Sequence, residues 1–473
     1  MMQRRYFLRS LLFVTGGMIA TRPFARWFRS KQVRRVAGRI ASKGKPLANV
    51  VVTDGYTVVT TDKTGSYAFD AHTDAQFVTI STPSGYDFLH TDHITRQYQP
   101  IDGLSEGRAD FNLEKLSAND QQHRFIIWAD PQVKNKDDVS KMMNESVPDL
   151  KKTVSLIPAG TPVHGICVGD IVWDTPELFH DYDKAIKEAA VPFFQAKGNH
   201  DMDYRLGGNE TSAITFKKMY GPTYYSFNRG QAHYVVLDDV FYLGKEREYK
   251  GHITQEQLDW LEKDLSFVPK DRLLIVCLHI PVHNGVDNRA ELYKLMKPFA
   301  KAHIMSGHTH YNRNVITDGI YEHNHGTVCG AWWTGPICED GTPDGYGVYE
   351  VKGTDLSWHY QSTGQDKTHQ LSLFIQNNEA GTGEEMVTNV FNWDPAWKVE
   401  WWVDDNYKGV LTNKPGFDPL AVATLKGPSL PAKRGFAEPK KTDHLFSAPL
   451  EAGYKSVKVR ATDRFGRVYE AKA

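Results

Sequence analysis

The chain has 473 residues, more than one hydrophobic core usually organises, so we expect two to three domains. Its 56 lysine and arginine residues nearly balance its 57 acidic residues, giving a net charge of −1. This balance does not favour nucleic acid or an anionic membrane surface as the partner. Aromatic residues make up 12% of the chain, a content that suits β-rich domains with aromatic cores.

The first 30 residues have the pattern of an export signal. Arg4 and Arg5 precede Phe7-Leu8, and an apolar run follows from Leu11 to Ala20. A basic start before a short apolar run is typical of export, and the arginine pair resembles a twin-arginine signal. We therefore expect an exported protein, periplasmic or associated with the cell envelope. No strong cleavage site follows, so an uncleaved N-terminal membrane anchor stays open as an alternative.

Residues 34–114 contain short β-rich runs separated by turn residues. The runs lie at 36–40, 48–53, 58–61 and 77–80. Closely spaced strands with such turns predict a small β-sandwich. The order of glycine, proline and valine residues from Gly38 to Tyr67 resembles a transthyretin-type, carboxypeptidase-regulatory-like domain. The resemblance implies a spacer or stabilising domain.

Between residues 122 and 363, apolar runs alternate with helical patterns. Strands are expected at 125–128, 163–168, 192–196, 272–278 and 302–305, and helices at 177–190, 254–265 and 288–301. Thr254 and Gln257 fit a capping box. Alternating strands and helices predict an α/β sheet, whose ligands collect at the carboxyl ends of the strands.

Short polar clusters stand where those strands run out. They read WADPQ (128–132), GDIVWD (169–174), GNHD (198–201), LHIP (278–281) and GHTH (307–310). Carboxylate, amide and imidazole groups suit divalent Mn, Zn, Fe or Mg. Two such ions can supply an activated hydroxide and clamp the oxygens of a phosphate ester. Each cluster taken alone could be an ordinary turn, but their joint occurrence at strand ends favours metal chemistry.

These clusters resemble the motifs of the calcineurin-like metallophosphoesterases. The resemblance implies that Asp130, Asp170 and His310 hold one metal ion. It implies that Asp170, Asn199, His279 and His308 hold a second, with Asp170 bridging. His200 would then donate a proton to the leaving group or stabilise the transition state, oriented by Asp174 or Asp201.

The first cluster departs from the family pattern at Gln132, where a histidine ligand is usual. A glutamine carbonyl can ligate a hard cation or hydrogen-bond a water molecule, although more weakly than imidazole binds a metal. We therefore treat Gln132 as a candidate ligand of the first metal ion.

Several residues near the clusters are candidates for substrate contact. Trp332 and Trp333 follow GHTH and could line the pocket rim, and Tyr204 and Arg205 follow GNHD, where arginine can grip phosphate. His283 is a further candidate. A sixth cluster, YVVLDD (234–239), has no place in the family ligand set, so Asp238 and Asp239 are expected to close a strand.

Residues 367–473 predict a β-rich C-terminal domain. Strands are expected at 370–375, 386–391, 397–403 and 456–462, and five prolines predict an irregular connection from 406 to 443. The last hairpin fits an immunoglobulin-like sandwich. Cys167 and Cys277 lie in predicted buried strands, whereas Cys329 and Cys338 could pair in an exported protein.

The three-part order resembles an exported bacterial phosphoesterase architecture. The expected fold is α/β, with a central metallophosphoesterase β-sandwich, flanking helices, and N-terminal and C-terminal all-β sandwich domains. The leading hypothesis is a phosphoesterase with two divalent ions, acting on a small-molecule or polymer-linked phosphate monoester or diester. The alternative is a non-catalytic glycan or surface-polymer binding protein with a degenerate metal site. A metal-dependent nuclease has little support, because the chain is neutral and has no basic stretches.

Overall fold

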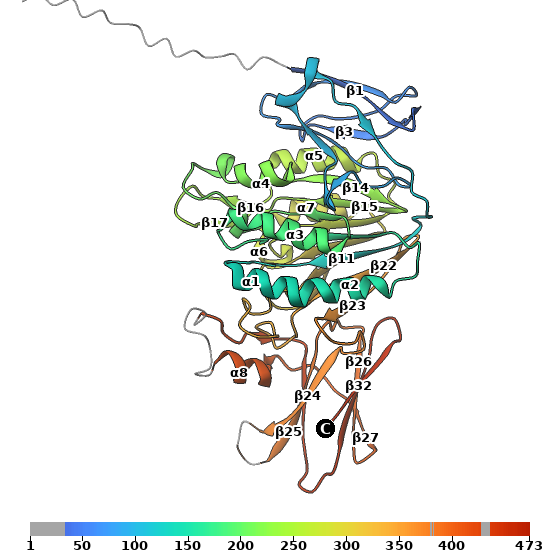
Figure 1. The fold of residues 1–473 in the computed structure, drawn as a ribbon. Helices are drawn as coiled ribbons and strands as arrows, with labels where there is room; N and C mark the ends of the chain where they lie inside the picture. Colours follow the sequence, from blue (N-terminus) through green and yellow to red (C-terminus); the bar gives the residue numbers. More distant parts are fainter. Residues whose placement is uncertain (1–33, 379–380, 382, 427–435) are drawn as a thin grey trace, which may run out of the picture.

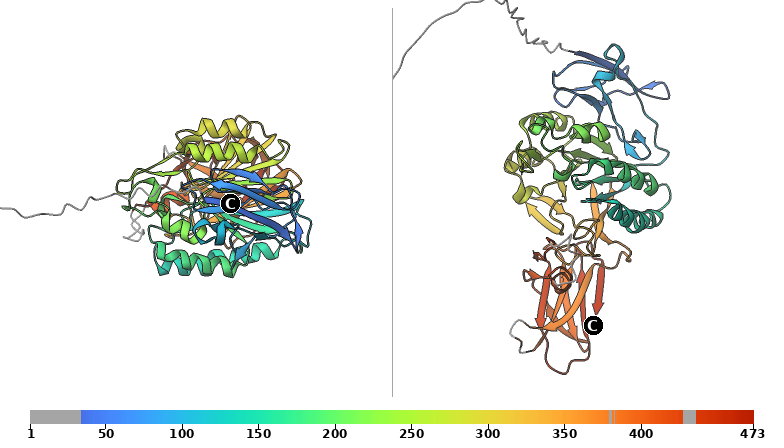
Figure 2. Two further views of the ribbon diagram at one scale, coloured as in Figure 1. Left: turned by 90° about the horizontal axis from the view of Figure 1, so that it is seen from above. Right: turned by 60° about the vertical axis from the view of Figure 1, so that its left-hand side comes forward.

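The computed structural model describes residues 34–473, apart from 379–380, 382 and 427–435. The chain forms three bodies stacked end to end, with the N-terminal body above the central one and the C-terminal body below it (Figure 1). The turned views in Figure 2 show the same order. The expected export signal at residues 1–30 lies outside the described residues.

The N-terminal body consists of two small sheets, with strand orders β10-β1-β2, where β5 also pairs with β1, and β4-β3-β6-β9. Their strands are β1 (Arg34–Ser42), β2 (Lys45–Pro46), β3 (Val51–Thr53), β4 (Val58–Thr60), β5 (Ser66–Ala71), β6 (Phe77–Ile80), β9 (Tyr98–Pro100) and β10 (Phe111–Asn112). The sheets enclose one apolar core. A hairpin of β7 (His90–Thr91) and β8 (Ile94–Thr95) leaves this body and extends the central sheet, where Ile94 pairs with Phe193.

The central body is built on two sheets packed face to face. Their strand orders are β23-β22-β11-β12-β13-β8-β7 and β14-β15-β18-β19-β21-β20. The strands are β11 (Gln122–Trp128), β12 (Val163–Cys167), β13 (Phe193–Gln195), β14 (Tyr225–Arg229), β15 (Ala232–Val236), β18 (Leu273–Cys277), β19 (Lys301–Ser306), β20 (Arg313–Thr317), β21 (Ile320–Asn324), β22 (Gly345–Lys352) and β23 (Asp355–Ser362). A separate hairpin pairs β16 (Val240–Tyr242) with β17 (Tyr249–Gly251). The parallel strands β11, β12 and β13 lie in one sheet, and β15, β18 and β19 in the other.

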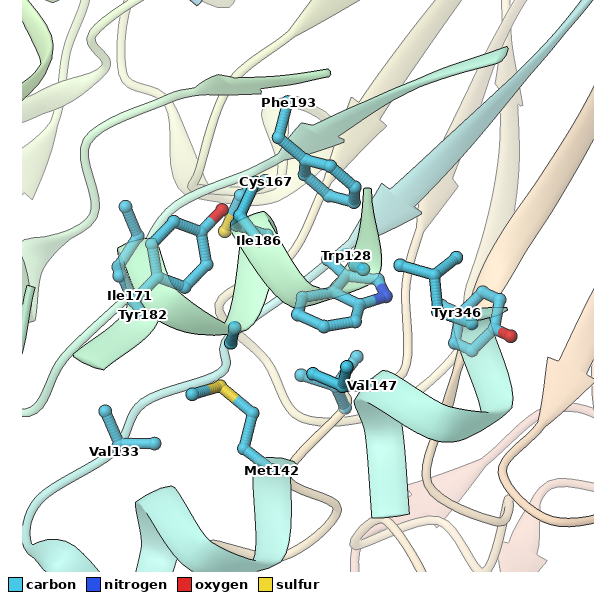
Figure 3. Packing of buried hydrophobic residues seen from close by; sticks show 14 of the residues in the cluster. Trp128, Val133, Met142, Val147, Cys167, Ile171, Tyr182, Ile186, Phe193 and Tyr346 are labelled. Atoms are coloured by element: carbon cyan, nitrogen blue, oxygen red, sulfur yellow. The ribbon is translucent and has the colours of Figure 1, made fainter. Parts of the chain in front are cut away.

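Both faces of the central sheets are buried, which explains why their strands read as continuous apolar runs. Successive side chains of β11 point to opposite faces. Phe125 and Ile127 enter the core between the sheets, whereas Ile126 and Trp128 enter a second core under the helices. Figure 3 shows Trp128 in this second core, with Met142 and Tyr182 from the covering helices. The result is a helix–sheet–sheet–helix sandwich.

Helices cover the outer faces of the two central sheets. They are α1 (Lys136–Lys141), α2 (Val147–Ser155), α3 (Phe179–Ala189), α4 (Ile214–Tyr220), α5 (Gln255–Leu265), α6 (Val282–Gly285) and α7 (Arg289–Met296). Within the part of the chain that the structure describes, no helix is both long and apolar enough to cross a membrane. The expected capping box of α5 is wrong. Thr254 makes no side-chain cap bond, and the Gln257 amide instead pairs with the backbone of Asp238.

The C-terminal body contains sheets with the orders β24-β25-β30 and β27-β26-β31-β32, and a short pair β28-β29. Its strands are β24 (Leu371–Asn377), β25 (Glu384–Val390), β26 (Lys398–Val403), β27 (Asn406–Val410), β28 (Gly416–Phe417), β29 (Lys441–Thr442), β30 (Leu445–Pro449), β31 (Val457–Thr462) and β32 (Val468–Lys472). Together with the other bodies, it confirms the expected α/β class with a central β-sandwich and β-rich units at both ends.

Two expectations for the C-terminal half need correction. The connection after residue 406 is partly regular, because it forms β27 and helix α8 (Pro419–Leu425). Pro419 stands in the first turn of α8, where a missing N–H costs nothing, and the Asp418 side chain caps the helix by accepting from Ala421 N. Cys338 is a buried thiol outside any disulfide, so it is not paired with Cys329.

Candidate metal centre

The polar clusters meet at one edge of the central sandwich. Asp130, Asp170 and Asn199 follow β11, β12 and β13 of the first sheet, and His279, His308 and His310 follow β18 and β19 of the second. Because the strands within each set run parallel, their carboxyl ends lie at the same edge. The two sheets face each other, and this brings residues distant in sequence into one cluster.

The backbone of this cluster is strained. Six of its residues have a positive φ, a conformation that is uncommon for residues with side chains. They are Asp130 (48°), Gln132 (41°), Asp170 (50°), Asp174 (52°), His308 (70°) and His310 (56°). Such strain collects where the surrounding structure fixes side chains for a function.

Two glycines permit the close approach of the loops. A Cβ atom on Gly198 would lie 2.1 Å from Asp170 N and 2.2 Å from its Oδ1. A Cβ atom on Gly307 would lie 2.5 Å from Asp130 Oδ2. The GNHD and GHTH loops can therefore reach the aspartates only because these positions carry no side chain.

One set of ligand atoms surrounds the ring of His279. Its Nε2 lies 3.1 Å from Asn199 Oδ1, 3.1 Å from His308 Nδ1 and 3.3 Å from Asp170 Oδ2. The candidate ligand atoms of Asp170, His279 and His308 all lie within 4.8 Å of one another. The other nitrogen of His279, Nδ1, lies 2.9 Å from Val168 O and donates to it. This bond fixes the tautomer, which leaves Nε2 available to a metal ion.

His310 and Asp130 form a second pair of candidate ligands. His310 Nε2 is 3.7 Å from Asp130 Oδ1, and His310 Nδ1 lies 3.1 Å from Gly330 O, to which it donates. Gln132 donates its amide N–H to Asp170 Oδ2 at 3.1 Å. The Oε1 atom of Gln132 is buried without a hydrogen-bond partner. Asp170 Oδ2 thus contacts both Gln132 Nε2, at 3.1 Å, and His279 Nε2, at 3.3 Å.

The electrostatics of the centre suit cations. Burial raises the pKa of Asp130 to about 8 and lowers the pKa values of His308 to about 3 and His310 to about 4. Burial alone would also lower the pKa of His279, but Asp170 and Asp130 outweigh it and raise that pKa to about 10. The centre therefore combines neutral imidazoles, on His308 and His310, with aspartates that favour a positive charge near His279. Buried carboxylates beside neutral imidazoles are a fitting donor set for divalent ions.

His200 lies beside the ligands and is oriented by a carboxylate. Its Nδ1 is 2.9 Å from Asp174 Oδ1, and its backbone N–H donates to Asp170 Oδ1 at 2.8 Å. Burial would lower the pKa of His200, but Asp170 and Asp174 outweigh it and raise the pKa. Of the two carboxylates considered from the sequence, Asp174 contacts the ring. Asp201 instead accepts from the backbone N–H groups of Gly198 and Val172, and so braces the loop.

Sequence reasoning missed the contribution of Asp239. It is fully buried and accepts hydrogen bonds from the backbone N–H groups of His279 at 3.1 Å and Ile280 at 3.0 Å. Its neighbour Asp238 pairs with the buried Lys197 at 3.0 Å. The YVVLDD cluster therefore does follow a strand, but it also positions the loop that carries His279. Two acidic residues at a strand end were the only signal.

The expected substrate contacts separate into different environments. Trp333 is 5% exposed and donates its indole N–H to Pro131 O at 3.1 Å, so it supports the Asp130 loop and its placement at the rim is wrong. Trp332 stacks on His310, with ring centroids 4.3 Å apart. Arg205 is exposed and pairs with Glu246, and the Tyr204 hydroxyl donates to Asn199 O. His283 pairs with Glu322 at 3.1 Å.

Three further residues at the centre were not singled out from the sequence. Arg247 pairs with Asp174 Oδ2 at 2.8 Å, Trp173 lies 5.2 Å from the His200 ring, and Phe436 lies 4.9 Å from the Trp332 ring, both measured between centroids. Arg247 and Phe436 come from segments without a motif, so only the folded chain brings them to the site.

Comparisons with known proteins cover most of the described chain. Residues 34–116 match the family model for the N terminal of calcineurin-like phosphoesterase, residues 123–312 match calcineurin-like phosphoesterase, and residues 322–469 match the C terminal of calcineurin-like phosphoesterase. No curated protein matches the chain.

Solved structures that match part of the chain include three phosphatases or nucleotidases. A dimetal phosphatase from Danio rerio is 14% identical, covers 51% of this chain and 96% of its own, and has a TM-score of 0.37. A purple acid phosphatase from yellow lupin (Lupinus luteus) seeds is 13% identical, with 67% and 68% coverage and a TM-score of 0.40. A 5′-nucleotidase precursor from Thermus thermophilus is 11% identical, with 51% and 54% coverage and a TM-score of 0.30.

Proposed function

The chain belongs to the calcineurin-like phosphoesterase family and is a phosphate-ester hydrolase, and on this premise we propose that it is an exported enzyme that uses two divalent cations. The observation that carries the two-cation proposal is the meeting of Asp130, Asp170, Asn199, His279, His308 and His310 at one edge of the sandwich. Asp170 Oδ2 contacts both His279 and Gln132, and this supports a carboxylate shared by two cations.

The residues divide into two groups that would hold the cations. Asp130, His310 and Asp170 form one group, with Gln132 beside them. Asp170, Asn199, His279 and His308 form the other. When bound, the cations would activate water and neutralise charge on the phosphoryl oxygens.

His200 would act on the leaving group. The interaction with Asp174 orients its ring and favours the protonated form, so the free ring nitrogen Nε2 can give a proton to the departing alkoxide. Arg247 pairs with the second oxygen of Asp174 and restrains that carboxylate. Asp201 keeps the GNHD loop close to Asp170 through its two backbone contacts. These residues would thus fix the side of the phosphoryl group from which the leaving alkoxide receives its proton.

Export and substrate type are parts of the same proposal. The arginine pair and the apolar run in residues 1–30 favour delivery to the periplasm or cell envelope, either cleaved or retained as an N-terminal anchor. The substrate is a small-molecule or polymer-linked phosphate ester, and the cations are Mn, Zn, Fe or Mg.

Metal analysis and hydrolysis together test this function. Purified, metal-replete protein should contain about two cations per chain and hydrolyse p-nitrophenyl phosphate or bis(p-nitrophenyl) phosphate. Asp170→Asn should lower both the metal content and turnover, because Asp170 faces both groups of ligands. Asp355→Asn, at a side chain that is 84% exposed, is the matched control. A metal-free wild-type protein after metal-replete expression would instead support the surface-polymer binding alternative.

A further inference from the structure

Three aromatic side chains form a connected group beside the metal centre. They are Trp173, Trp332 and Phe436, which we call the aromatic group. The ring centroids of Trp173 and Trp332 lie 6.1 Å apart, those of Trp173 and Phe436 5.3 Å, and those of Trp332 and Phe436 4.9 Å. The Phe436 ring meets both tryptophans edge to face, at interplanar angles of 71° and 77°.

The aromatic group touches the proposed catalytic residues directly. Trp173 lies 5.2 Å from the His200 ring, and Trp332 is stacked on His310 at 4.3 Å with an interplanar angle of 23°. Trp173 also directly precedes Asp174, which orients His200. Since His200 would protonate the departing alkoxide, the aromatic group lies on the leaving-group side of the phosphoryl site.

The aromatic group retains exposed surface despite its mutual contacts. Phe436 is 45% exposed, and Trp173 and Trp332 are partly buried. Lys134 Nζ lies over the Trp173 ring, 4.7 Å from its centroid, and adds a positive charge to the aromatic group. Exposed aromatic faces beside a catalytic group provide apolar area on which a ring of the substrate can stack.

The C-terminal segment holds Phe436 in place through its neighbours. Ala437 is buried in a small core with Ala331, Ile337, Ala421 and Leu425, against which Trp332 packs. Glu438 N donates to Glu339 Oε1, and Lys440 N donates to Glu339 O at 2.8 Å. Glu339 N in turn donates to His310 O at 3.1 Å. The segment that carries Phe436 is therefore connected to the loop that carries His310.

We propose that Trp173, Trp332 and Phe436 form a subsite for a flat-faced ring in the alcohol part of the phosphate ester. This inference rests on the proposed hydrolysis. It adds that the C-terminal body takes part in substrate selection through Phe436. Two ring chemistries share the required flat face, an aromatic ring and the apolar face of a sugar ring. Both gain from stacking on tryptophan and phenylalanine.

Two esters with similar leaving groups isolate the contribution of the ring. Benzyl phosphate and butyl phosphate both release primary alcohols, but only the first carries a ring. Wild-type enzyme should prefer benzyl phosphate in kcat/KM by about tenfold, which corresponds to about 1.4 kcal/mol. Phe436→Ala should lower the value for benzyl phosphate severalfold and leave that for butyl phosphate unchanged, and Phe436→Tyr should restore the preference.

A matched variant controls for the loss of an exposed aromatic ring elsewhere. Phe417 is 47% exposed, close to the 45% of Phe436, and lies in β28 of the C-terminal body. Phe417→Ala should keep the wild-type ratio of the two esters. An equal effect of the two substitutions would overturn the subsite.

Binding of inert analogues gives a readout that does not depend on turnover. Calorimetry on metal-replete protein should show tighter binding of benzylphosphonate than of butylphosphonate, and Phe436→Ala should remove this difference. A wild-type protein that hydrolyses no ester contradicts the proposed function. Hydrolysis with equal kcat/KM for both esters, together with equal affinity for both phosphonates, contradicts the subsite alone.

A hexose 6-phosphate distinguishes the two ring chemistries. If Phe436→Ala lowers kcat/KM for benzyl phosphate only, the subsite takes an aromatic ring. If it lowers kcat/KM for the hexose phosphate as well as for benzyl phosphate, the subsite also takes the face of a sugar. Loss for neither ester overturns the proposal.

Discussion

Gln132 is held from one side only. Its amide N–H donates to Asp170 Oδ2, while its Oε1 is buried and has no hydrogen-bond partner. A buried polar atom without a partner costs free energy, and native structures usually satisfy it. Because the amide contacts Asp170 and lies two residues after Asp130, a cation is a fitting partner for its oxygen. The opposite orientation of the amide would exchange its nitrogen and oxygen. The oxygen would then face the Asp170 carboxylate, which donates no hydrogen bond, so the observed orientation is the favourable one.

Substitution of Gln132 should change the retention of metal ions. Gln132→Ala removes the amide. It should lower, by about tenfold, the chelator concentration needed to strip the cation proposed to lie between Asp130, Asp170 and His310. Gln132→His supplies an imidazole and should raise that concentration. The measurement is the number of cations per chain after dialysis against graded chelator. Gln231→Ala, at a partly buried residue outside the centre, is the control, and equal retention in Gln132→Ala and wild type would contradict the role of Gln132.

The trio of His200, Asp174 and Arg247 shows what the sequence could and could not predict at this scale. His200 and Asp174 belong to motifs, so their pairing could be expected. Arg247 lies in the loop between β16 and β17, and no motif marks it. Its role follows only from the folded position of that loop. Trp333 illustrates the opposite error, because a tryptophan next to a motif is as suited to the core as to a rim.

At the scale of elements, the site depends on how closely the strand ends approach. The turn after β13 passes the turn after β12 with Gly198 against Asp170. Strand order and apolar runs could be predicted from the sequence, since both faces of the sheets are buried. The boundaries of α7 and the missing cap of α5 could not, because tertiary contacts decide them. Gln257, for example, binds the Asp238 backbone instead of the helix end.

Gly198→Ala should disrupt the centre. The added Cβ would lie 2.1 Å from Asp170 N, a backbone atom that cannot move without displacing the bridging carboxylate. We expect loss of about one cation per chain or more, and a decrease in turnover of at least about tenfold. Elemental analysis and p-nitrophenyl phosphate hydrolysis measure the two effects. Gly103→Ala is the control, because a Cβ atom there meets nothing within 4 Å. Full metal content in Gly198→Ala would show that the loop can shift.

A buried histidine outside the metal centre, His303, should make the stability of the protein depend on pH. Burial lowers the pKa of His303 in β19 to about 3, with smaller contributions from Arg464 and Lys301. An unfolded chain has a histidine pKa near 6.5, so between these values the unfolded state binds a proton that the folded state does not. The free energy of unfolding must therefore fall as the pH falls below about 6.5.

His303→Phe should weaken this acid sensitivity. Phenylalanine can keep the ring contacts with Tyr321 and Trp358 but does not titrate. Between pH 6.5 and pH 5, wild type should lose about 2 kcal/mol more stability than the variant. Chemical unfolding at both pH values and at pH 8 measures the difference. If the two proteins lose the same stability, His303 does not carry this dependence.

At the scale of the whole molecule, the outer bodies are tied to the central sandwich on both sides. The β7–β8 hairpin of the N-terminal segment extends the seven-stranded sheet. On the other side, the buried Asp340 accepts from Asn312 N at 2.8 Å and lies 3.1 Å from His444 Nε2. His444 Nδ1 contacts Asn389 Oδ1 at 2.7 Å. The order of the three bodies could be predicted from the sequence, whereas these ties join residues that no local pattern connects.

His444→Phe should therefore affect substrate choice from a distance. It removes the imidazole bridge between Asp340 and Asn389, while Asp340 O still accepts from Asn389 Nδ2 and the Asp340 side chain keeps its bonds to Asn312 and Thr342. If this bridge fixes the position of Phe436, the preference for benzyl over butyl phosphate should fall severalfold toward the Phe436→Ala value. Metal content and kcat/KM for butyl phosphate should stay unchanged, because the ligands are left intact.

A histidine in the same body provides the control for that substitution. His369 lies near the Phe391 ring, at 5.2 Å, and takes no part in the Asp340 contacts described above. His369→Phe should keep the wild-type preference. Folded His444→Phe protein with an unchanged benzyl preference would mean that the small core around Ala437 alone fixes Phe436. A decrease confined to His444→Phe would mean that contacts between the C-terminal and central bodies set the geometry of the ring subsite.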